Sequence, residues 1–250
     1  MRILIGGPAR QDVPTFIEHL KTIRDLELPE GVSVDLFYIL NDCPELKPLL
    51  DPSQYAEINT GDEYKRTEET HFWTQGNLTK MSFLRNRFLK EVLLGKYEYG
   101  MFVDTDLCLQ PETLKWLLDA KKDIVAEIFW TKSSPDGEAV WPNCWDYDQS
   151  QSDDESYRKW LTPGVYRVGG TGACMLFSAD VPKACVSYSP IYNIRRALRG
   201  EDRWFMIRAA CAGFELFVDT HAPARHLYRP SDYENYMRCI YGDEYNPDHS

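Results

Sequence analysis

The stretch Phe102-Val103-Asp104-Thr105-Asp106 joins an apolar, strand-like run to two carboxylates. Side chains alternate along an extended chain, so Asp104 and Asp106 point the same way and Thr105 points away. Two carboxylates on one side suit one hard cation, such as Mg²⁺ or Mn²⁺. Acidic residues also follow strands at ordinary surface turns, so the surrounding sequence has to decide between a metal site and a turn.

The sequence before this stretch alternates between strand and helix patterns. Residues 3–5 form a short apolar run, residues 14–26 carry apolar side chains at helical spacing, and residues 34–40 form a second strand-like run. This strand–helix–strand order predicts a parallel sheet. Ligands of parallel sheets bind beyond the carboxyl ends of the strands, which is where the acidic pair would lie.

The alternation continues along the chain, after a polar stretch at 59–77 that we expect to be a loop. Helical patterns cover 78–94, 111–120 and 201–212, and strand patterns cover 99–103, 124–130, 173–178 and 214–218. We find no internal repeat and no linker that splits the chain. We therefore expect one α/β domain over residues 1–250, with a mixed, mostly parallel central sheet flanked by helices.

Bulk composition narrows the classes of function. The formal net charge is −11, which argues against binding nucleic acid or an anionic membrane through a general basic field. No apolar run approaches the roughly 20 residues that a membrane-spanning helix needs. The 7 cysteines are scattered, odd in number and without a CxxC pair, so we expect reduced thiols and a cytoplasmic protein.

Residues 131–164 differ from the rest of the chain, because they are rich in Ser, Asp, Pro and Trp. We expect a long loop here, and long loops inside compact domains are commonly functional. Trp141, Trp145 and Trp160 offer large rigid faces on which the C–H face of a sugar can stack. The same rings would equally serve to anchor the loop to the body.

Glu201 and Asp202 stand at the start of the predicted helix 201–212. Acidic residues in a first turn stabilise the helix dipole and its free N–H groups. A carboxylate fixed there can also accept the proton of a reacting hydroxyl group, as a general base does. The two roles are compatible.

Two basic residues flank the acidic pair in sequence. Arg85 lies on the predicted helix 78–94, where it would pair with a diphosphate or simply face solvent. His226 follows the last predicted strand and is a candidate third metal ligand through a ring nitrogen, although a single histidine is more often a packed or exposed residue.

Taken in order, these pieces resemble the GT-A-fold glycosyltransferases. The resemblance is carried by Asn41-Asp42, by Arg85-Asn86 before Asp104-Thr105-Asp106 and Pro111, by Gly169-Gly170-Thr171-Gly172, by Gly200-Glu201-Asp202, and by Val218-Asp219 with His226-Leu227. The Glu-Asp helix is similar to that of inverting family-2 enzymes. The segments Gly169–Thr171 and His226–Ser231 are similar to the retaining Anp1/Mnn9-type mannosyltransferases, so the stereochemical outcome stays open.

The resemblance implies a division of labour within the domain. Residues 1–110 would bind the nucleotide sugar and residues 111–250, with the loop 131–164, would bind the acceptor. Pro8 and Asp42 would contact the nucleoside, and Arg85 and Asp104 the phosphates of a UDP- or GDP-sugar. Mn²⁺ or Mg²⁺ would be held by Asp104, Asp106 and His226.

The resemblance also implies an activity. The chain would move a hexose-type sugar to a hydroxyl group of a saccharide or glycoconjugate, with Asp202, beside Glu201, as the catalytic carboxylate. Donor sugar and acceptor are left undetermined by the sequence.

Other functions remain compatible with parts of the sequence. A sugar-phosphate nucleotidyltransferase shares the early architecture and would use Gly6-Gly7-Pro8-Ala9-Arg10 as a phosphate loop. A haloacid-dehalogenase-type phosphatase also has two such aspartates, but after an early strand. A non-catalytic carbohydrate-binding protein would explain the tryptophans and leave the acidic residues without a role.

Overall fold

The first strands of the sheet run parallel, as the strand–helix–strand pattern predicts. In the computed structural model, β1 (Arg2–Ala9) lies between β2 (Ser33–Asn41) and β4 (Tyr99–Phe102), and β3 (Tyr55–Ile58) extends the sheet beyond β2. The structure describes residues 1–61, 74–134, 139–146, 154–194 and 199–242. All strand carboxyl ends of this half therefore share one edge of the sheet.

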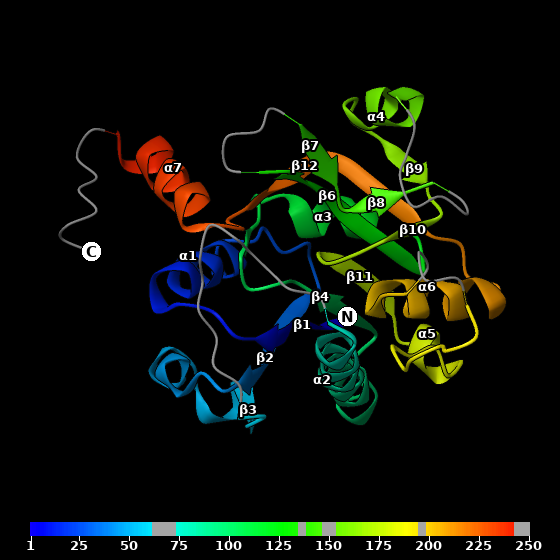
Figure 1. The fold of residues 1–250 in the computed structure, drawn as a ribbon, viewed down its shortest axis with the longest axis horizontal. Coiled ribbons are helices and arrows are strands. Elements are labelled where there is room, and N and C mark those ends of the chain that lie inside the picture. Colours follow the sequence, from blue (N-terminus) through cyan, green and yellow to red (C-terminus); the bar gives the residue numbers. More distant parts are fainter. Residues whose placement is uncertain (62–73, 135–138, 147–153, 195–198, 243–250) are drawn as a thin grey trace.

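The remaining strands make the sheet mixed. Its order is β3-β2-β1-β4-β11-β6-β12-β5, with β11 antiparallel to β4 and β6, and β12 parallel to β6 (Figure 1). The later strands are β5 (Leu107–Cys108), β6 (Ile124–Lys132), β7 (Val140–Pro142), β8 (Cys144–Trp145), β9 (Val165–Arg167), β10 (Gly170–Thr171), β11 (Met175–Ser178) and β12 (Phe217–His226). This confirms a single α/β domain with a mixed, mostly parallel sheet.

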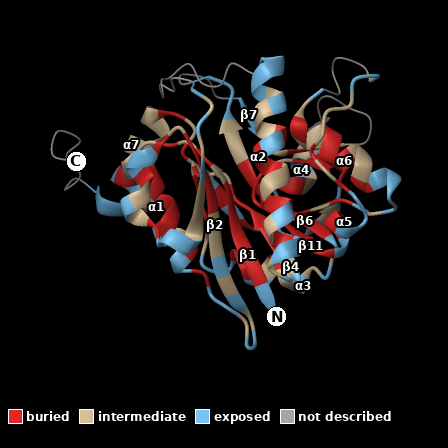
Figure 2. Ribbon diagram, turned by 90° about the horizontal axis from the view of Figure 1, so that it is seen from below, coloured by how far each residue is buried: buried red, intermediate tan, exposed pale blue. Residues whose placement is uncertain are grey.

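Helices cover both faces of the sheet, and its central strands β1, β4, β6 and β11 are mostly buried (Figure 2). The helices are α1 (Val13–Arg24), α2 (Gln75–Leu94), α3 (Thr113–Asp119), α4 (Asp154–Trp160), α5 (Asp180–Lys183), α6 (Glu201–Cys211) and α7 (Pro230–Tyr241), with short 3-10 turns at Pro44–Leu49 and Pro52–Gln54. No helix of the described residues is long and apolar enough to cross a membrane.

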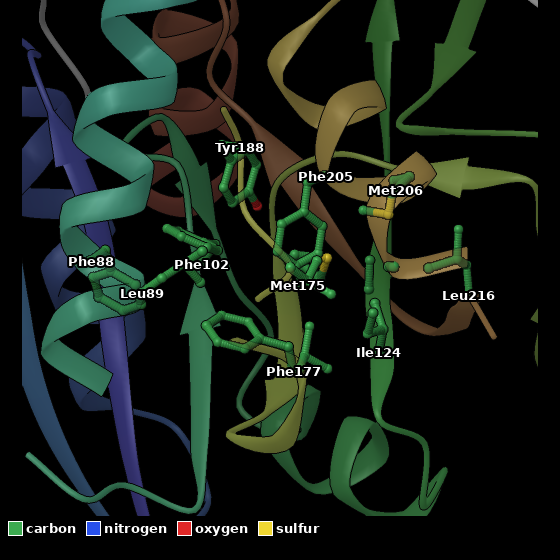
Figure 3. Close-up of a cluster of buried hydrophobic side chains, with 14 of the residues drawn as sticks. Phe88, Leu89, Phe102, Ile124, Met175, Phe177, Tyr188, Phe205, Met206 and Leu216 are labelled. Carbon is green, nitrogen blue, oxygen red and sulfur yellow. The ribbon is translucent and has the colours of Figure 1, made fainter. Parts of the chain in front are cut away.

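Aromatic side chains form the core that α2 and α6 share with the sheet. Phe88 of α2, Phe102 of β4 and Phe177 of β11 lie in one row, and Phe205 of α6 meets Phe177 and Tyr188 (Figure 3). These side chains are fully buried. Their burial fixes the start of α6 relative to the end of β4, which are the two elements that carry the predicted catalytic and metal-binding residues.

The predicted loop 131–164 is more ordered than the sequence indicated. Its described residues include β7, β8 and α4, because β7 pairs with the end of β6 and β8 pairs with β10. Residues 135–138 and 147–153 lie outside the described part of the chain, as do residues 62–73 of the other predicted loop. The last strand also runs further than predicted, to His226.

Gly6 and Gly7 lie inside β1, in register with Phe37 and Tyr38 of β2. A Cβ atom at Gly6 would come within 2.1 Å of the Phe37 carbonyl oxygen, and the φ angle of Gly6 is 146°. Only glycine fits this close approach. Gly6 therefore serves the close packing of β1 against β2.

Candidate active site

The turn Asp104–Asp106 begins where β4 ends, at the carboxyl edge of the parallel strands. The Leu107 amide donates to the Asp104 carbonyl oxygen at 3.0 Å, which closes the turn and starts β5. Val103, one residue before the turn, is buried in the core. The carboxylates are thus carried on a short, well-anchored turn rather than on a long loop.

Asp106 and His226 lie side by side. Strand β12 pairs with β5, and His226 stands opposite Leu107 in that pairing. The His226 Nε2 atom is 3.4 Å from Asp106 Oδ2, and the Leu227 amide donates to the Asp106 carbonyl oxygen at 2.7 Å. The structure therefore brings together two of the three residues predicted as metal ligands.

The other ring nitrogen of His226 is held by a residue that the sequence did not single out. Nδ1 lies 2.7 Å from the hydroxyl oxygen of Thr131, at the end of β6. With its proton on Nδ1, the ring donates to Thr131 and keeps the Nε2 lone pair directed toward Asp106. That arrangement is the one in which a histidine binds a metal ion.

The donor atoms of Asp106 and His226 suit a divalent cation whose remaining ligands come from the substrate and water. Two atoms bound to one Mg²⁺ or Mn²⁺ ion are about 3 Å apart when each lies about 2.1 Å from it, close to the separation of Asp106 Oδ2 and His226 Nε2. Among the described residues, no group of three or more His, Cys, Asp or Glu side chains can hold a metal ion. Phosphate oxygens and water are the usual remaining ligands in such sites.

Asp104 instead contacts Arg85. Its two carboxyl oxygens lie 3.2 and 3.4 Å from Arg85 Nη2, and the guanidinium carbon lies over the rings of Phe102 and Tyr188 at 5.5 and 5.4 Å. The Arg85 side chain is 4% exposed. Arg85 is therefore a buried residue that sets the position of Asp104, rather than an open cation on the helix surface.

The same guanidinium faces Glu201 and Asp202 at the start of α6, at 4.0 and 3.9 Å. Burial by itself lowers the pKa of Arg85, but the charges of Asp104 and Asp202 raise it above its usual value, so the side chain stays cationic. One buried arginine thus joins the turn after β4 to the first turn of α6.

Glu201 and Asp202 differ in accessibility. The Asp202 side chain is 26% exposed and the Glu201 side chain 7%. Burial raises the pKa of both carboxyl groups; the charge of Asp202 adds to the rise for Glu201, and Arg85 opposes it for each. Asp202 is the more open of the two, and a Cβ atom on Gly172 would lie 2.8 Å from its Oδ2 atom.

No protein-family model matches the sequence, and no curated protein matches it. Solved structures do. S. aureus TarS in complex with UDP-GlcNAc matches with a TM-score of 0.51 and 14% identity, over 100% of this chain and 69% of that one. GalNAc-T7 with UDP, GalNAc and Mn²⁺ matches with a TM-score of 0.54 and 11% identity, over 96% of this chain and 48% of that one.

The fold of the chain is of the GT-A type. At these identities the likeness is one of architecture, and it agrees with the sheet order and with the position of the acidic turn. The chain spans about half the length of GalNAc-T7. Its likeness to the Anp1/Mnn9-type branch stays a prediction from sequence.

Asp42 and Pro8, the predicted nucleoside contacts of this GT-A fold, lie at adjacent strand ends, since Pro8 of β1 pairs with Ile39 of β2. The Asp42 carboxylate accepts from the backbone amides of Thr60 and Gly61, at 2.9 and 3.1 Å. It also accepts from the Thr60 hydroxyl at 2.5 Å, the contact that lowers its pKa most. Asp42 ties the ends of β2 and β3 together, and its contact with a nucleoside stays a prediction.

The three predicted stacking tryptophans occupy different environments in the GT-A fold. Trp160 is 1% exposed, so it packs in the core and is closed to an acceptor. The Trp145 ring packs directly on Gly170, where a Cβ atom would clash with it. The guanidinium carbon of Arg203 lies 4.3 Å from the centroid of the same ring. Trp141 is 41% exposed and pairs with Thr131 across β6 and β7. Only Trp141 offers the expected open surface.

Sequence reasoning missed Thr131 and Tyr188, which touch the candidate site without carrying a motif. Nothing in the sequence marks Thr131, because its contact with His226 depends on how β6 lies beside β12. The burial of Arg85 had a signal: Arg85 lies three residues before Phe88 and four before Leu89, on the buried face of α2.

Proposed function

We propose that this chain is a metal-dependent glycosyltransferase that moves a hexose-type sugar from a UDP- or GDP-sugar to a hydroxyl group of a saccharide or glycoconjugate. The observation that carries the proposal is the adjacency of Asp106 and His226 at the carboxyl edge of a GT-A sheet. Of the two solved structures with a similar fold, TarS holds UDP-GlcNAc, and GalNAc-T7 holds UDP, GalNAc and Mn²⁺.

A divalent cation in this site would supply positive charge that stabilises the leaving nucleoside diphosphate. Asp106 and His226 would hold it directly. Asp104 lies at the same edge of the sheet and is held in place by Arg85. Besides this ion pair, Asp104 would contact the cation directly or through a water molecule.

Asp202 is the residue that we assign as general base. Its carboxylate would accept the proton of the acceptor hydroxyl as that oxygen bonds to the anomeric carbon. Its side chain is 26% exposed, more than that of Glu201, and Arg85 favours its charged form against the effect of burial. A base in this role implies inversion at the anomeric carbon, which the configuration of the product would test.

Trp141 is the residue that we assign to the acceptor. Its ring is exposed, it neighbours Thr131 in the sheet, and Thr131 contacts His226. A sugar stacked on Trp141 would therefore lie close to the proposed metal site. The Trp141→Ala variant is expected to raise KM for the acceptor and to leave donor binding unchanged.

The proposal is tested by calorimetric titration with UDP-, GDP-, CDP- and dTDP-sugars, each with and without Mn²⁺. We expect binding of one UDP- or GDP-sugar that is strengthened by Mn²⁺ and lost in chelator. Absence of binding with every donor contradicts the proposed function. Binding that is unaffected by chelator contradicts the metal site and leaves the donor assignment standing.

A further inference from the structure

The turn that carries Asp106 is held from two sides. On one side β12 pairs with β5, which places Arg225 opposite Cys108. On the other side helix α1 contributes side chains in place of a strand: His19 Nδ1 lies 2.8 Å from the Leu107 carbonyl oxygen, and the Leu109 amide donates to the Thr22 hydroxyl at 3.1 Å. β5 therefore has hydrogen-bond partners along both edges.

His19 can make this contact in only one tautomer. A carbonyl oxygen accepts and never donates, so His19 Nδ1 must carry the proton. Nε2 then accepts from the hydroxyl group of Tyr38, at 2.9 Å. Burial lowers the pKa of His19 to about 4, which keeps the ring neutral. Phe16 stacks against the ring and Tyr38 meets it edge-on.

The contact acts one peptide unit away from a proposed metal ligand. Leu107 follows Asp106 directly, and three hydrogen bonds fix the two consecutive peptide units there: Leu107 N to Asp104 O and Leu227 N to Asp106 O on the first, and His19 Nδ1 to Leu107 O on the second. A buried polar side chain costs folding free energy unless it is satisfied. Leucine at position 19 would fill similar space without that cost, but it would leave the Leu107 carbonyl oxygen without this donor.

We propose that His19 is a positioning residue for the metal-binding turn, because it holds Asp106 at the distance from His226 that a shared divalent cation requires. The inference rests on the proposed function, since it assumes that Asp106 and His226 bind the cation. Partners of this indirect kind typically change metal affinity about 10- to 100-fold when they are removed.

Two substitutions of His19 distinguish loss of the hydrogen bond to Leu107 from loss of the histidine itself. His19→Asn places an amide N–H near the position of Nδ1 and keeps the bond to Leu107, whereas the longer side chain of His19→Gln reaches toward Tyr38 and loses it. Leu20→Ala, on the same helix and fully buried, is the control for general destabilisation. His19→Leu removes the donor to the Leu107 carbonyl oxygen and tests the same contact should the glutamine variant fail to fold.

The affinity for Mn²⁺ is measured by calorimetric titration in the presence of UDP and, separately, of GDP. We expect His19→Gln and His19→Leu to weaken it about tenfold or more, and His19→Asn and Leu20→Ala to stay within about threefold of the unaltered protein. Equal affinity in His19→Gln and the unaltered protein overturns the inference alone, as does an equal loss in Leu20→Ala.

A second measurement does not depend on the cation. Amide hydrogen exchange is followed in peptides covering residues 104–109 and 226–229, without metal. We expect faster exchange in His19→Gln than in His19→Asn, because the Leu227 amide donates to Asp106 in this turn. Unchanged exchange overturns the inference. If the unaltered protein binds no Mn²⁺ with either UDP or GDP, the metal site fails and the inference fails with it.

Discussion

The Nε2 atom of His226 lies 3.4 Å from Oδ2 of Asp106, although the two residues are far apart in the sequence. The contact exists because β12 runs back along β5 and sets His226 opposite Leu107. A carboxylate oxygen and an imidazole nitrogen at this separation are close enough to bind the same divalent cation.

Substitution of Asp106 tests that arrangement. Asp106→Ala removes one of two protein ligands, so we expect Mn²⁺ affinity to fall at least about tenfold and transfer to be abolished. Asp180→Ala is the control, because Asp180 is an exposed aspartate that pairs only with Lys183 on its own short helix among the contacts described. Transfer that survives in Asp106→Ala, or that persists in chelator, contradicts the metal role.

Substitutions of Asp202 and Glu201 are expected to have different effects on turnover. Asp202→Asn removes the proposed base, so we expect kcat to fall about 10²- to 10⁴-fold with donor binding retained. Glu201→Gln imitates the protonated side chain that burial favours, so kcat should fall far less. Initial rates and donor titrations measure both. Undiminished turnover in Asp202→Asn would reduce Asp202 to a helix-capping role.

The pH profile gives an independent view of Asp202. Burial raises the pKa of Asp202 above its usual value, so the base becomes active only as pH rises through that raised pKa. We expect kcat/KM to climb on the acid side with an apparent pKa above that of an ordinary aspartate, and this limb should vanish in the residual activity of Asp202→Asn. A limb that persists there belongs to another group.

Arg85 is the cation that three carboxylates share. Arg85→Met keeps the volume but leaves Asp104, Glu201 and Asp202 without it, and we expect the free energy of unfolding to fall by about 3–5 kcal/mol in urea titrations. Arg87→Met on the same helix is the matched control, since Arg87 is partly exposed and pairs with Glu91; its loss should cost about 1 kcal/mol or less. Equal losses of unfolding free energy in the two variants would contradict the stabilising role of Arg85.

Local periodicity explains why much of the fold was predictable. The apolar runs of β1, β2 and β4 and the helical spacing of α2 are local features, and they predict a parallel half-sheet with its acidic turn at the carboxyl edge. The adjacency of Asp106 and His226 could be predicted only through the family resemblance, because nothing local in either segment specifies their pairing.

The rest of the site depends on long-range registers. β12 shifts its register against β6 between Asp219 and Ala224, and this irregularity decides that His226 meets Thr131. β7 and α4 arise inside a stretch whose polar composition predicts a loop, because β7 gains its partners from β6. Nothing in the local sequence distinguishes His19 from other helical residues, because its contact with Leu107 depends on how α1 packs against β5.

Glu127 makes the stability of the fold depend on pH. It is fully buried in β6 beside Asp219 of β12, with which it is in register, and Asp219 is buried as well. Burial, and then the charge of Asp219, raise the pKa of Glu127 to about 9. In the unfolded chain an ordinary glutamate releases its proton near pH 4.3. Between these two values the folded protein therefore holds a proton that the unfolded chain has lost.

The sign follows from that difference in bound protons. Because the folded state binds more protons in this window, the contribution of Glu127 to stability is complete below pH about 4 and is lost as pH rises toward about 9. The loss is at most about 1.4 kcal/mol per pH unit. Urea titrations from pH 6 to 9 should show a decline that Glu127→Gln flattens and that Glu57→Gln, at a partly exposed site paired with Lys47, leaves unchanged. An identical slope in all three proteins would show that Glu127 ionises normally.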